Sequence, residues 1–155
     1  MDMGVALAAI GAALAVGLAG AGSSIGVSLA GKSATGVISE KPELFGRVFV
    51  LQALPATQGI YGFLIAILIL LKIGLLGGNI TALTDAQGWA YLAAGLAIGV
   101  SGLVSGAYQG QIAGSAIMMT GKDPSLSTRG MTMTVMVETY AILGLLVSIL
   151  IYFGI

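Results

Sequence analysis

Four long runs of the chain are nearly free of charged residues, and this pattern sets the expected architecture. The runs cover residues 3–31, 48–71, 86–121 and 130–155, and only the last contains a charge, that of Glu138. A helix needs about 20 apolar residues to cross the roughly 30 Å hydrocarbon core of a membrane. Each run meets that requirement, so the pattern predicts four transmembrane helices.

The expected helices lie at about residues 4–38, 46–74, 86–120 and 127–153. They form a first hairpin over residues 1–76 and a second over residues 77–155. Pro42 and Pro124 fall in the turns of these hairpins, where a proline ends one helix without disturbing its interior. The first run lacks the positive segment of a signal peptide and is too long for its apolar core, so we expect it to be retained.

The second half of the chain repeats the first at a distance of 82 residues. Pro42 and Arg47 align with Pro124 and Arg129 in this register. The same shift aligns further pairs: Gly17 with Gly99, Gly20 with Gly102, Ser23 with Ser105, Ser33 with Ser115, Thr57 with Thr139, Ile60 with Ile142, and Gly62 with Gly144. Because each hairpin has an even number of spans, both insert in the same orientation. The sequence therefore predicts an all-α membrane protein of two parallel, duplicated hairpins.

Small residues recur at four-residue spacing in the first and third spans. The series are Gly20, Ser24 and Ser28 in the first span, and Gly102, Gly106, Gly110 and Gly114 in the third. Residues four apart share a helix face, and small residues let helix backbones approach closely in lipid. Packing within one four-helix unit explains these series, and so does packing against identical copies.

Basic residues indicate how the chain is oriented in the membrane. Five of them flank the two turns that close the hairpins: Lys32, Lys41, Arg47, Lys122 and Arg129. The other side of the membrane has only Lys72. The positive-inside rule then places both turns in the cytoplasm and both termini outside. We interpret the five flanking charges as interfacial anchors.

Composition supports the membrane assignment and excludes several functions. Of the 155 residues, 57% are hydrophobic and 8% charged, against about 25% charged in soluble domains. The net charge is zero, so the basic surface of a nucleic-acid-binding protein is missing. The chain has no Cys and no His, which excludes disulfides, zinc sites of the usual kind and His-based catalysis.

Glu138 is the charged residue expected deep in the membrane. It lies nine residues after Arg129, which places it about 13 Å along the fourth helix. A carboxylate at that depth costs at least about 2.5–3.5 kcal/mol, so it indicates a site for a proton or a cation. No basic residue lies at comparable depth in any span, which argues against a structural ion pair.

Polar residues of the second and third spans lie at a similar depth. Pro55 lacks an N–H and so disturbs the helical ladder, which leaves nearby carbonyls available. Thr57, Gln58 and Tyr61 are spaced to point into one sector, and Gln109 adds an amide. These neutral oxygens beside one carboxylate favour a hard cation, sodium, over a proton.

The repeat indicates how many such sites one chain carries. Under the 82-residue shift, Glu138 corresponds to Ala56, so only one hairpin holds an acid. If the protein moves ions, we therefore expect one ion per chain.

Three segments resemble one known family. They are LPATQGIYGF (54–63), VETYAILG (137–144) and EKPELFGR (40–47). Together they make the chain similar to the proteolipid, or c/K-ring, subunit of V-type rotary ATPases, in the bacterial sodium-pumping branch. The resemblance implies that the sodium ion is held by a backbone carbonyl and four side chains, and that a tyrosine holds the glutamate. The positions are Leu54 for the carbonyl, Thr57, Gln58, Gln109 and Glu138 for the side chains, and Tyr61 for the tyrosine.

The resemblance also implies an assembly. Identical four-helix subunits would form a ring in the plasma membrane of a prokaryote, surrounded by lipid and turning against a stator subunit that supplies an arginine. Central-stalk subunits would bind on the cytoplasmic side, and other subunits would hydrolyse ATP, since this chain has no nucleotide-binding motif. The chain would then not be an enzyme by itself.

Three other interpretations remain at this point. The same ring could carry protons, with the polar residues only hydrogen-bonding a protonated Glu138. A small stand-alone transporter or channel could use Pro55 as a helix break near the midplane. A purely structural membrane protein would leave the cost of Glu138 unexplained.

Overall fold

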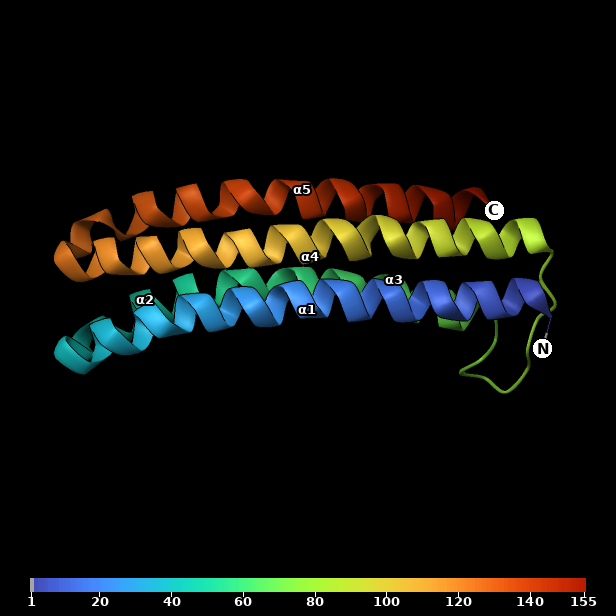
Figure 1. Ribbon diagram of the computed structural model, residues 1–155, viewed down its shortest axis with the longest axis horizontal. Helices are drawn as coiled ribbons and strands as arrows, with labels where there is room; N and C mark the ends of the chain where they lie inside the picture. The colour runs from blue at the N-terminus through green and yellow to red at the C-terminus, as the bar shows by residue number, and fades with distance from the viewer. Residues whose placement is uncertain (1) are drawn as a thin grey trace.

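The computed structural model describes residues 2–155, which form four long rods lying side by side in a gently curved bundle (Figure 1). Met1, at which the predicted first hairpin begins, lies outside the described residues. The helices are α1 (Met3–Glu40), α2 (Phe45–Ala53), α3 (Thr57–Lys72), α4 (Asp85–Lys122) and α5 (Ser127–Gly154). The second rod contains both α2 and α3, which are separated by a 3-10 turn at Leu54–Ala56.

The four rods are long and apolar enough to cross a membrane. The spanning segments are Met3–Glu40, Pro42–Lys72, Asp85–Lys122 and Pro124–Gly154. Residues 2–155 contain no strand. The prediction of an all-α membrane protein with four spanning helices is therefore confirmed.

The turns that close the two hairpins lie at one end of the bundle and are hydrogen-bonded to each other. Pro42 and Pro124 each begin a short 3-10 turn between two rods. The Lys41 ammonium donates to the carbonyl of Gly121 at 2.6 Å, and the Arg47 guanidinium donates to the carbonyl of Pro124 at 2.6 Å. Two cations of the first hairpin thus bind backbone carbonyls of the second.

Asp123 fixes the start of the second of these turns. The side chain and backbone N–H of Ser125 hydrogen-bond to the Asp123 carboxylate, and this lowers the pKa of Asp123, with a smaller contribution from the charge of Arg129. The backbone N–H lies 2.9 Å from Oδ1. Asp123 therefore stays ionised and acts only as an acceptor.

The opposite end of the bundle holds the connection between the hairpins. Gly74 and Gly78 adopt φ values of 72° and 71°, a left-handed conformation that glycine tolerates best. The chain then enters α4 through a capping box in which the Thr84 hydroxyl accepts from the N–H of Gln87 at 3.3 Å. The reciprocal bond runs from the N–H of Thr84 to the Gln87 side chain at 3.1 Å.

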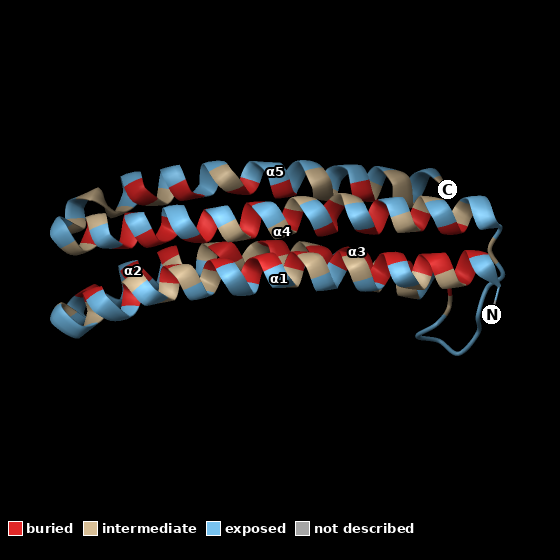
Figure 2. Ribbon diagram, in the orientation of Figure 1, coloured by how far each residue is buried: buried red, intermediate tan, exposed pale blue. Residues whose placement is uncertain are grey.

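Backbone contact between α1 and α4 forms the centre of the fold. A Cβ added to Gly106 would lie 2.7 Å from the backbone of Gly22, and one added to Gly110 would collide with the backbone of Gly26. Buried residues accordingly follow α1 and α4, while the outer side of α5 is exposed (Figure 2). The glycine series predicted on the third span therefore packs within the chain.

The small-residue series predicted on the first span lies on a different face. In the described part of the chain, nothing lies within 4 Å of a Cβ added to Gly20, and Ser24 and Ser28 are exposed. The face of α1 that meets α4 instead carries Gly11, Gly22 and Gly26. Two small-residue faces thus exist on α1, and only one of them is covered within the chain.

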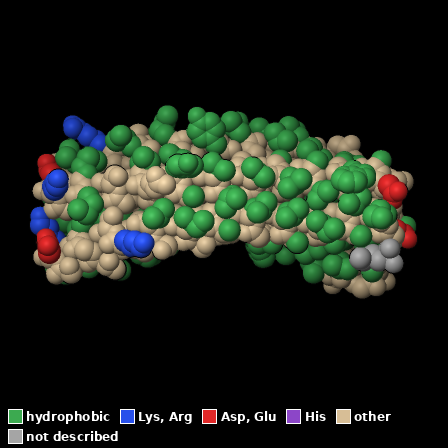
Figure 3. Space-filling model, in the orientation of Figure 1, with side chains coloured by type: hydrophobic (Ala, Val, Ile, Leu, Met, Phe, Trp, Pro, Cys, Tyr) green, Lys and Arg blue, Asp and Glu red, His purple; other side chains and the backbone are tan. Residues whose placement is uncertain are grey.

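The outside of the bundle has the surface of a membrane protein. Hydrophobic side chains cover its length, and most charged side chains gather at the two ends, with Lys and Arg toward one of them (Figure 3). Large apolar residues such as Phe63 on α3 and Leu150 on α5 are more than half exposed. This surface suits contact with lipid or with other apolar helices.

Candidate functional site

The break between α2 and α3 positions the first part of the site. Pro55 has no N–H, and the helix tightens to a 3-10 turn over Leu54–Ala56. The N–H of Gly59 donates to the Ser23 hydroxyl at 2.7 Å. The Leu54 carbonyl accepts the hydroxyl of Thr57 at 3.0 Å.

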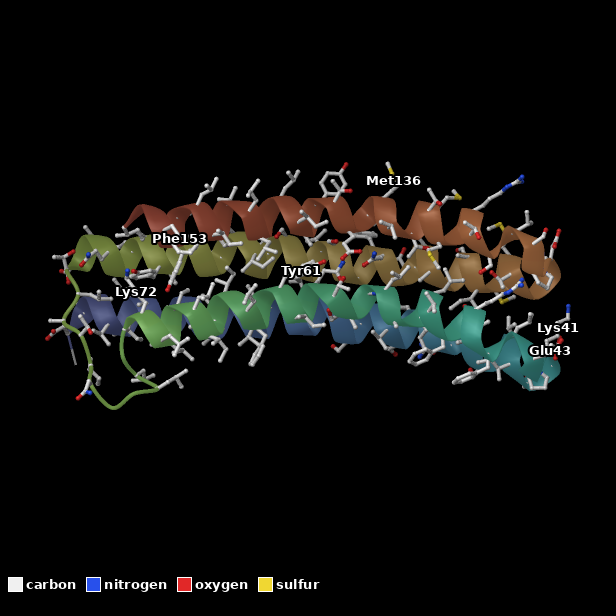
Figure 4. The ribbon with its side chains drawn as sticks, turned by 180° about the vertical axis from the view of Figure 1, so that it is seen from behind. Lys41, Glu43, Tyr61, Lys72, Met136 and Phe153 are labelled. Atoms are coloured by element: carbon white, nitrogen blue, oxygen red, sulfur yellow. The ribbon has the colours of Figure 1, made fainter. Side chains whose placement is uncertain are left out.

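Glu138 lies at the meeting point of α3, α4 and α5. The Tyr61 hydroxyl donates to Glu138 Oε1 at 2.6 Å, and the Gln109 amide nitrogen lies 3.5 Å from Oε2. Glu138 is only 8% exposed, and Gln109 is fully buried. Figure 4 shows Tyr61 on α3 near the middle of the bundle. The carboxylate is therefore held between helices of both hairpins, well away from the ends.

Hydrogen bonds extend from Glu138 back to the helix break. The Gln58 amide nitrogen donates to Gln109 Oε1 at 2.5 Å, and Thr57 Oγ1 lies 3.4 Å from Gln58 Oε1. Thr57 in turn bonds to the Leu54 carbonyl. The structure thus joins all the residues assigned to the site from the sequence in one polar network.

Four further residues take part in these hydrogen bonds and were not predicted from the sequence. Ser105 accepts the Gln58 amide at 3.3 Å and donates to the carbonyl of Val137 at 2.9 Å. The carbonyl of Thr134 accepts the Gln109 amide at 3.2 Å, and Ser23 accepts from α3 as described above. The repeat aligns Ser23 with Ser105, and that pairing was the signal that could have identified both serines.

The network fixes the direction of the Gln58 amide. Its nitrogen donates to Gln109 and to Ser105, so its oxygen remains available for another partner. That oxygen adjoins the hydroxyl of Thr57. Among residues 2–155, no buried side-chain nitrogen or oxygen lacks a hydrogen-bond partner. Each buried polar side chain of the site therefore has at least one hydrogen-bond partner.

The residues present suit a monovalent cation. The available ligands are oxygens, from the carboxylate of Glu138, the amide of Gln58, the hydroxyl of Thr57 and the carbonyl of Leu54, and hard cations prefer such ligands. The described residues contain no group of three or more His, Cys, Asp or Glu that could hold a metal. One carboxylate neutralises one positive charge, so a divalent ion would keep a buried net charge.

The bond from Tyr61 to Glu138 gives a first testable prediction. Tyr61→Phe removes a hydrogen bond to a charged group, which is worth about 1.5–3 kcal/mol. At a site that binds sodium, the sodium concentration that half-protects Glu138 from a carbodiimide should then rise roughly 10-fold or more. Tyr152→Phe removes the same atom from a side chain near the outer end of α5, far from Glu138, and serves as the control. Equal protection of the two variants would contradict the assigned role of Tyr61.

Each half of the chain matches the same known family. The profile of the family described as the C subunit of ATP synthase matches residues 10–69 and again residues 92–151. The chain belongs to the ATP synthase C-subunit family. The two matches start 82 residues apart (92 − 10), the same shift as in the sequence repeat. Duplication of a helical hairpin of this family is therefore confirmed.

The similar proteins within this family are membrane subunits of V-type and A-type ATPases. The chain is 41% identical over 119 residues to the K subunit of the V-type sodium ATPase of Enterococcus hirae. This alignment covers 77% of this chain and 72% of that protein. It is 45% identical over 149 residues to the K subunit of the A-type ATP synthase of Methanocaldococcus jannaschii, covering 96% of this chain but 63% of that protein. The 16 kDa proteolipid of a V-type proton ATPase of Nephrops norvegicus is 27% identical over 124 residues.

The predicted resemblance to the rotor proteolipid is confirmed by these matches. As a member of the family, the chain is a multi-pass membrane protein and the rotor proteolipid of a V- or A-type ATPase. This proteolipid is not itself catalytic, since ATP hydrolysis belongs to other subunits of such ATPases. A rotor proteolipid of this family works with identical copies in a ring.

Proposed function

We propose that each copy of the chain carries one sodium ion across the membrane during rotation, with Glu138 as the carrying carboxylate. The observation that carries this proposal is the network of neutral oxygens around a single buried acid. The relative in Enterococcus hirae, which is named as a sodium ATPase subunit, supports the same ion. ATP hydrolysis by other subunits drives this transport.

The roles follow from charge and geometry. Glu138 supplies the charge that neutralises the ion, and the hydroxyl of Thr57, the amides of Gln58 and Gln109 and the carbonyl of Leu54 replace part of its hydration. Tyr61 holds the carboxylate in position through its 2.6 Å bond. For the ion to enter, the Gln109 amide must turn from Glu138 so that its oxygen faces the ion.

A filled site can face lipid, and an empty one cannot. A bare carboxylate in hydrocarbon is strongly unfavourable, whereas a carboxylate paired with a cation is not. The ring therefore rotates only when the site that leaves the stator is filled. A stator arginine that competes for Glu138 releases the ion on the other side. The choice of ion therefore controls rotation, because only an ion that the site binds allows the site to face the lipid.

The proposed orientation follows from the charges at the turns. Five of the six basic residues flank the end where the hairpins close, and under the positive-inside rule this supports a cytoplasmic location for that end and an outside location for both termini. Central-stalk subunits would bind at these turns. The relatives from a bacterium and an archaeon support the plasma membrane of a prokaryote as the location.

A proton-carrying ring is the second candidate. The bond from the Tyr61 hydroxyl to Glu138 can be kept by a protonated carboxyl, because the carbonyl oxygen of the acid still accepts. The relative in Nephrops norvegicus is named as a proton ATPase proteolipid. In that case the oxygens of Thr57 and Gln58 serve only as hydrogen-bond partners.

Labelling of Glu138 by a hydrophobic carbodiimide distinguishes the two candidates. The reagent modifies a protonated, accessible carboxyl, so a bound sodium ion should protect it. We expect millimolar sodium to slow the labelling of the detergent-extracted ring at fixed pH, and the same concentration of potassium to leave the rate unchanged. A labelling rate that depends on pH alone would contradict sodium binding and support the proton ring.

A further inference from the structure

A buried serine of α4 connects two other helices of the site. Ser105 is 3% exposed, and α4 lies between α5 and the first hairpin (Figure 1). The Ser105 hydroxyl accepts the side-chain amide of Gln58 on α3, with 3.3 Å between the nitrogen and Oγ. The same hydroxyl donates to the carbonyl of Val137 on α5 at 2.9 Å. Val137 directly precedes Glu138, so one hydroxyl joins a proposed ligand of the ion to the backbone beside the proposed carrier.

The bond to Val137 determines what Ser105 can offer to Gln58. A serine hydroxyl has one hydrogen, and a carbonyl oxygen can only accept. The hydrogen is used by Val137, so only a lone pair of Ser105 Oγ faces Gln58. A lone pair attracts the NH2 group of an amide and repels its oxygen. Ser105 therefore fixes the Gln58 amide with its nitrogen toward α4 and its oxygen beside Thr57.

The second acceptor of the Gln58 nitrogen is Gln109, and the entry of an ion changes it. Gln109 Oε1 lies 2.5 Å from the Gln58 nitrogen. The proposed binding of sodium requires the Gln109 amide to turn so that its oxygen faces the ion, which withdraws that oxygen from Gln58. The hydroxyl of Ser105 then remains as an acceptor for the Gln58 nitrogen. A buried NH2 group without an acceptor is unfavourable, so Ser105 matters most when the site is filled.

A bound proton makes no such demand on Gln58. A protonated Glu138 keeps its bond with the Tyr61 hydroxyl and needs no oxygen from Gln58. A cation, in contrast, is held by oxygens, and an NH2 group cannot replace one of them. The direction of the Gln58 amide therefore affects the binding of a cation and not that of a proton.

We propose that Ser105 is a positioning residue that favours sodium over a proton by keeping the oxygen of Gln58 turned toward the ion. This inference rests on the proposed function, because Gln58 acts as a ligand only if sodium binds at Glu138. Ser105 does not touch the ion and acts through Gln58. Without the hydroxyl, the Gln58 amide is free to turn by 180° and to present its NH2 group to the ion.

The chain offers a matched control for a purely structural role of Ser105. Ser148 on α5 is fully buried, and its hydroxyl donates to the carbonyl of Ala94 on α4 at 2.7 Å. It lies ten residues beyond Glu138, which is about 15 Å along the helix. Ser148→Ala therefore removes a bond of the same kind between the same two helices, without any change at Gln58.

Carbodiimide labelling of Glu138 in the detergent-extracted ring separates the two roles. We expect Ser105→Ala to raise the sodium concentration that half-protects Glu138 roughly 5-fold or more, the effect of one lost hydrogen bond. The labelling rate without sodium, at the same pH, should equal that of the wild-type ring, because Glu138 and Tyr61 are unchanged. Ser148→Ala should leave both quantities at their wild-type values.

Two further variants keep the test independent of Ser105→Ala alone. Ser105→Cys nearly keeps the size of the side chain but replaces the hydroxyl with a weaker hydrogen-bonding group, so it should shift sodium protection in the same direction. Gln58→Met removes the amide through which Ser105 acts. In that background, Ser105→Ala should cause no further rise in the half-protecting concentration of sodium.

The outcomes for Ser105 and for the proposed function can be told apart. If sodium protects the wild-type and Ser105→Ala rings at the same concentration, the role of Ser105 is wrong and the proposed function stands. An equal rise in Ser105→Ala and Ser148→Ala, or a further rise in the Gln58→Met background, would also overturn that role, because Ser105 would then act on packing and not through Gln58. A wild-type ring that sodium does not protect would overturn the proposed function and this inference together.

Discussion

The Glu138→Gln variant is expected to assemble into a ring that neither binds nor transports sodium. Glutamine has nearly the same shape and can keep the contact with Tyr61, so the fold should survive. It cannot neutralise a cation, however, and leaving a buried charge without its partner costs about 3–5 kcal/mol. We expect sodium binding to the isolated ring to weaken by at least roughly 100-fold, and sodium uptake by vesicles that contain the whole ATPase to stop.

Glu43→Gln is the matched control for this experiment. Glu43 is an acidic residue in the turn after Pro42, exposed and distant from the network around Glu138. Its substitution removes the same charge and should leave sodium binding and uptake unchanged. Sodium uptake that persists in the Glu138→Gln variant would contradict the assignment of Glu138 as the carrier. Loss of the ring itself in that variant would contradict the view that Glu138 acts in transport and not in folding.

The Gly110→Ala variant is expected to destabilise the whole four-helix unit. A Cβ at this position would collide with the backbone of Gly26, and a helix backbone cannot move aside as a flexible side chain can. Adding one methyl group to a closely packed core costs about 1–3 kcal/mol, and here every copy in the ring carries the change. Separation of α4 from α1 would also shift Gln109, which directly precedes Gly110. We expect a lower yield of ring in the membrane and dissociation at a lower temperature in detergent.

Gly46→Ala provides the same chemical change at a position with free space. Gly46 is exposed on α2, and among the described residues nothing lies within 4 Å of a Cβ added there. Its ring should be recovered in normal yield and dissociate at the normal temperature. If Gly110→Ala were as stable as Gly46→Ala, close backbone contact would not be what holds α1 and α4 together.

Much of the fold could be predicted from the sequence because the membrane imposes simple rules. Charge-free runs gave the four spans, and the prolines at positions 42 and 124 gave the turns. The position of Glu138 in a span identified the centre of the site, because a carboxylate is so unfavourable there. These features follow from the composition of single helices and do not depend on how the helices pack.

Features that depend on packing were harder to predict. Both faces of α1 carry small residues at helical spacing, and the sequence alone selected Gly20, Ser24 and Ser28, whereas Gly22 and Gly26 are the ones that meet α4. Periodicity shows which residues share a face, but it does not show which face meets a partner. Ser105 was passed over for a related reason, since a serine in a membrane helix usually bonds to its own helix.

The length of the central helices has a mechanical consequence. α1 and α4 each contain 38 residues, so each is about 57 Å long, nearly twice the roughly 30 Å thickness of the hydrocarbon core. They touch backbone to backbone, and Lys41 and Arg47 tie their turns together. A torque applied at those turns would thus reach the level of Glu138 with little elastic twist, because the close contact between the two backbones makes the pair of helices torsionally stiff.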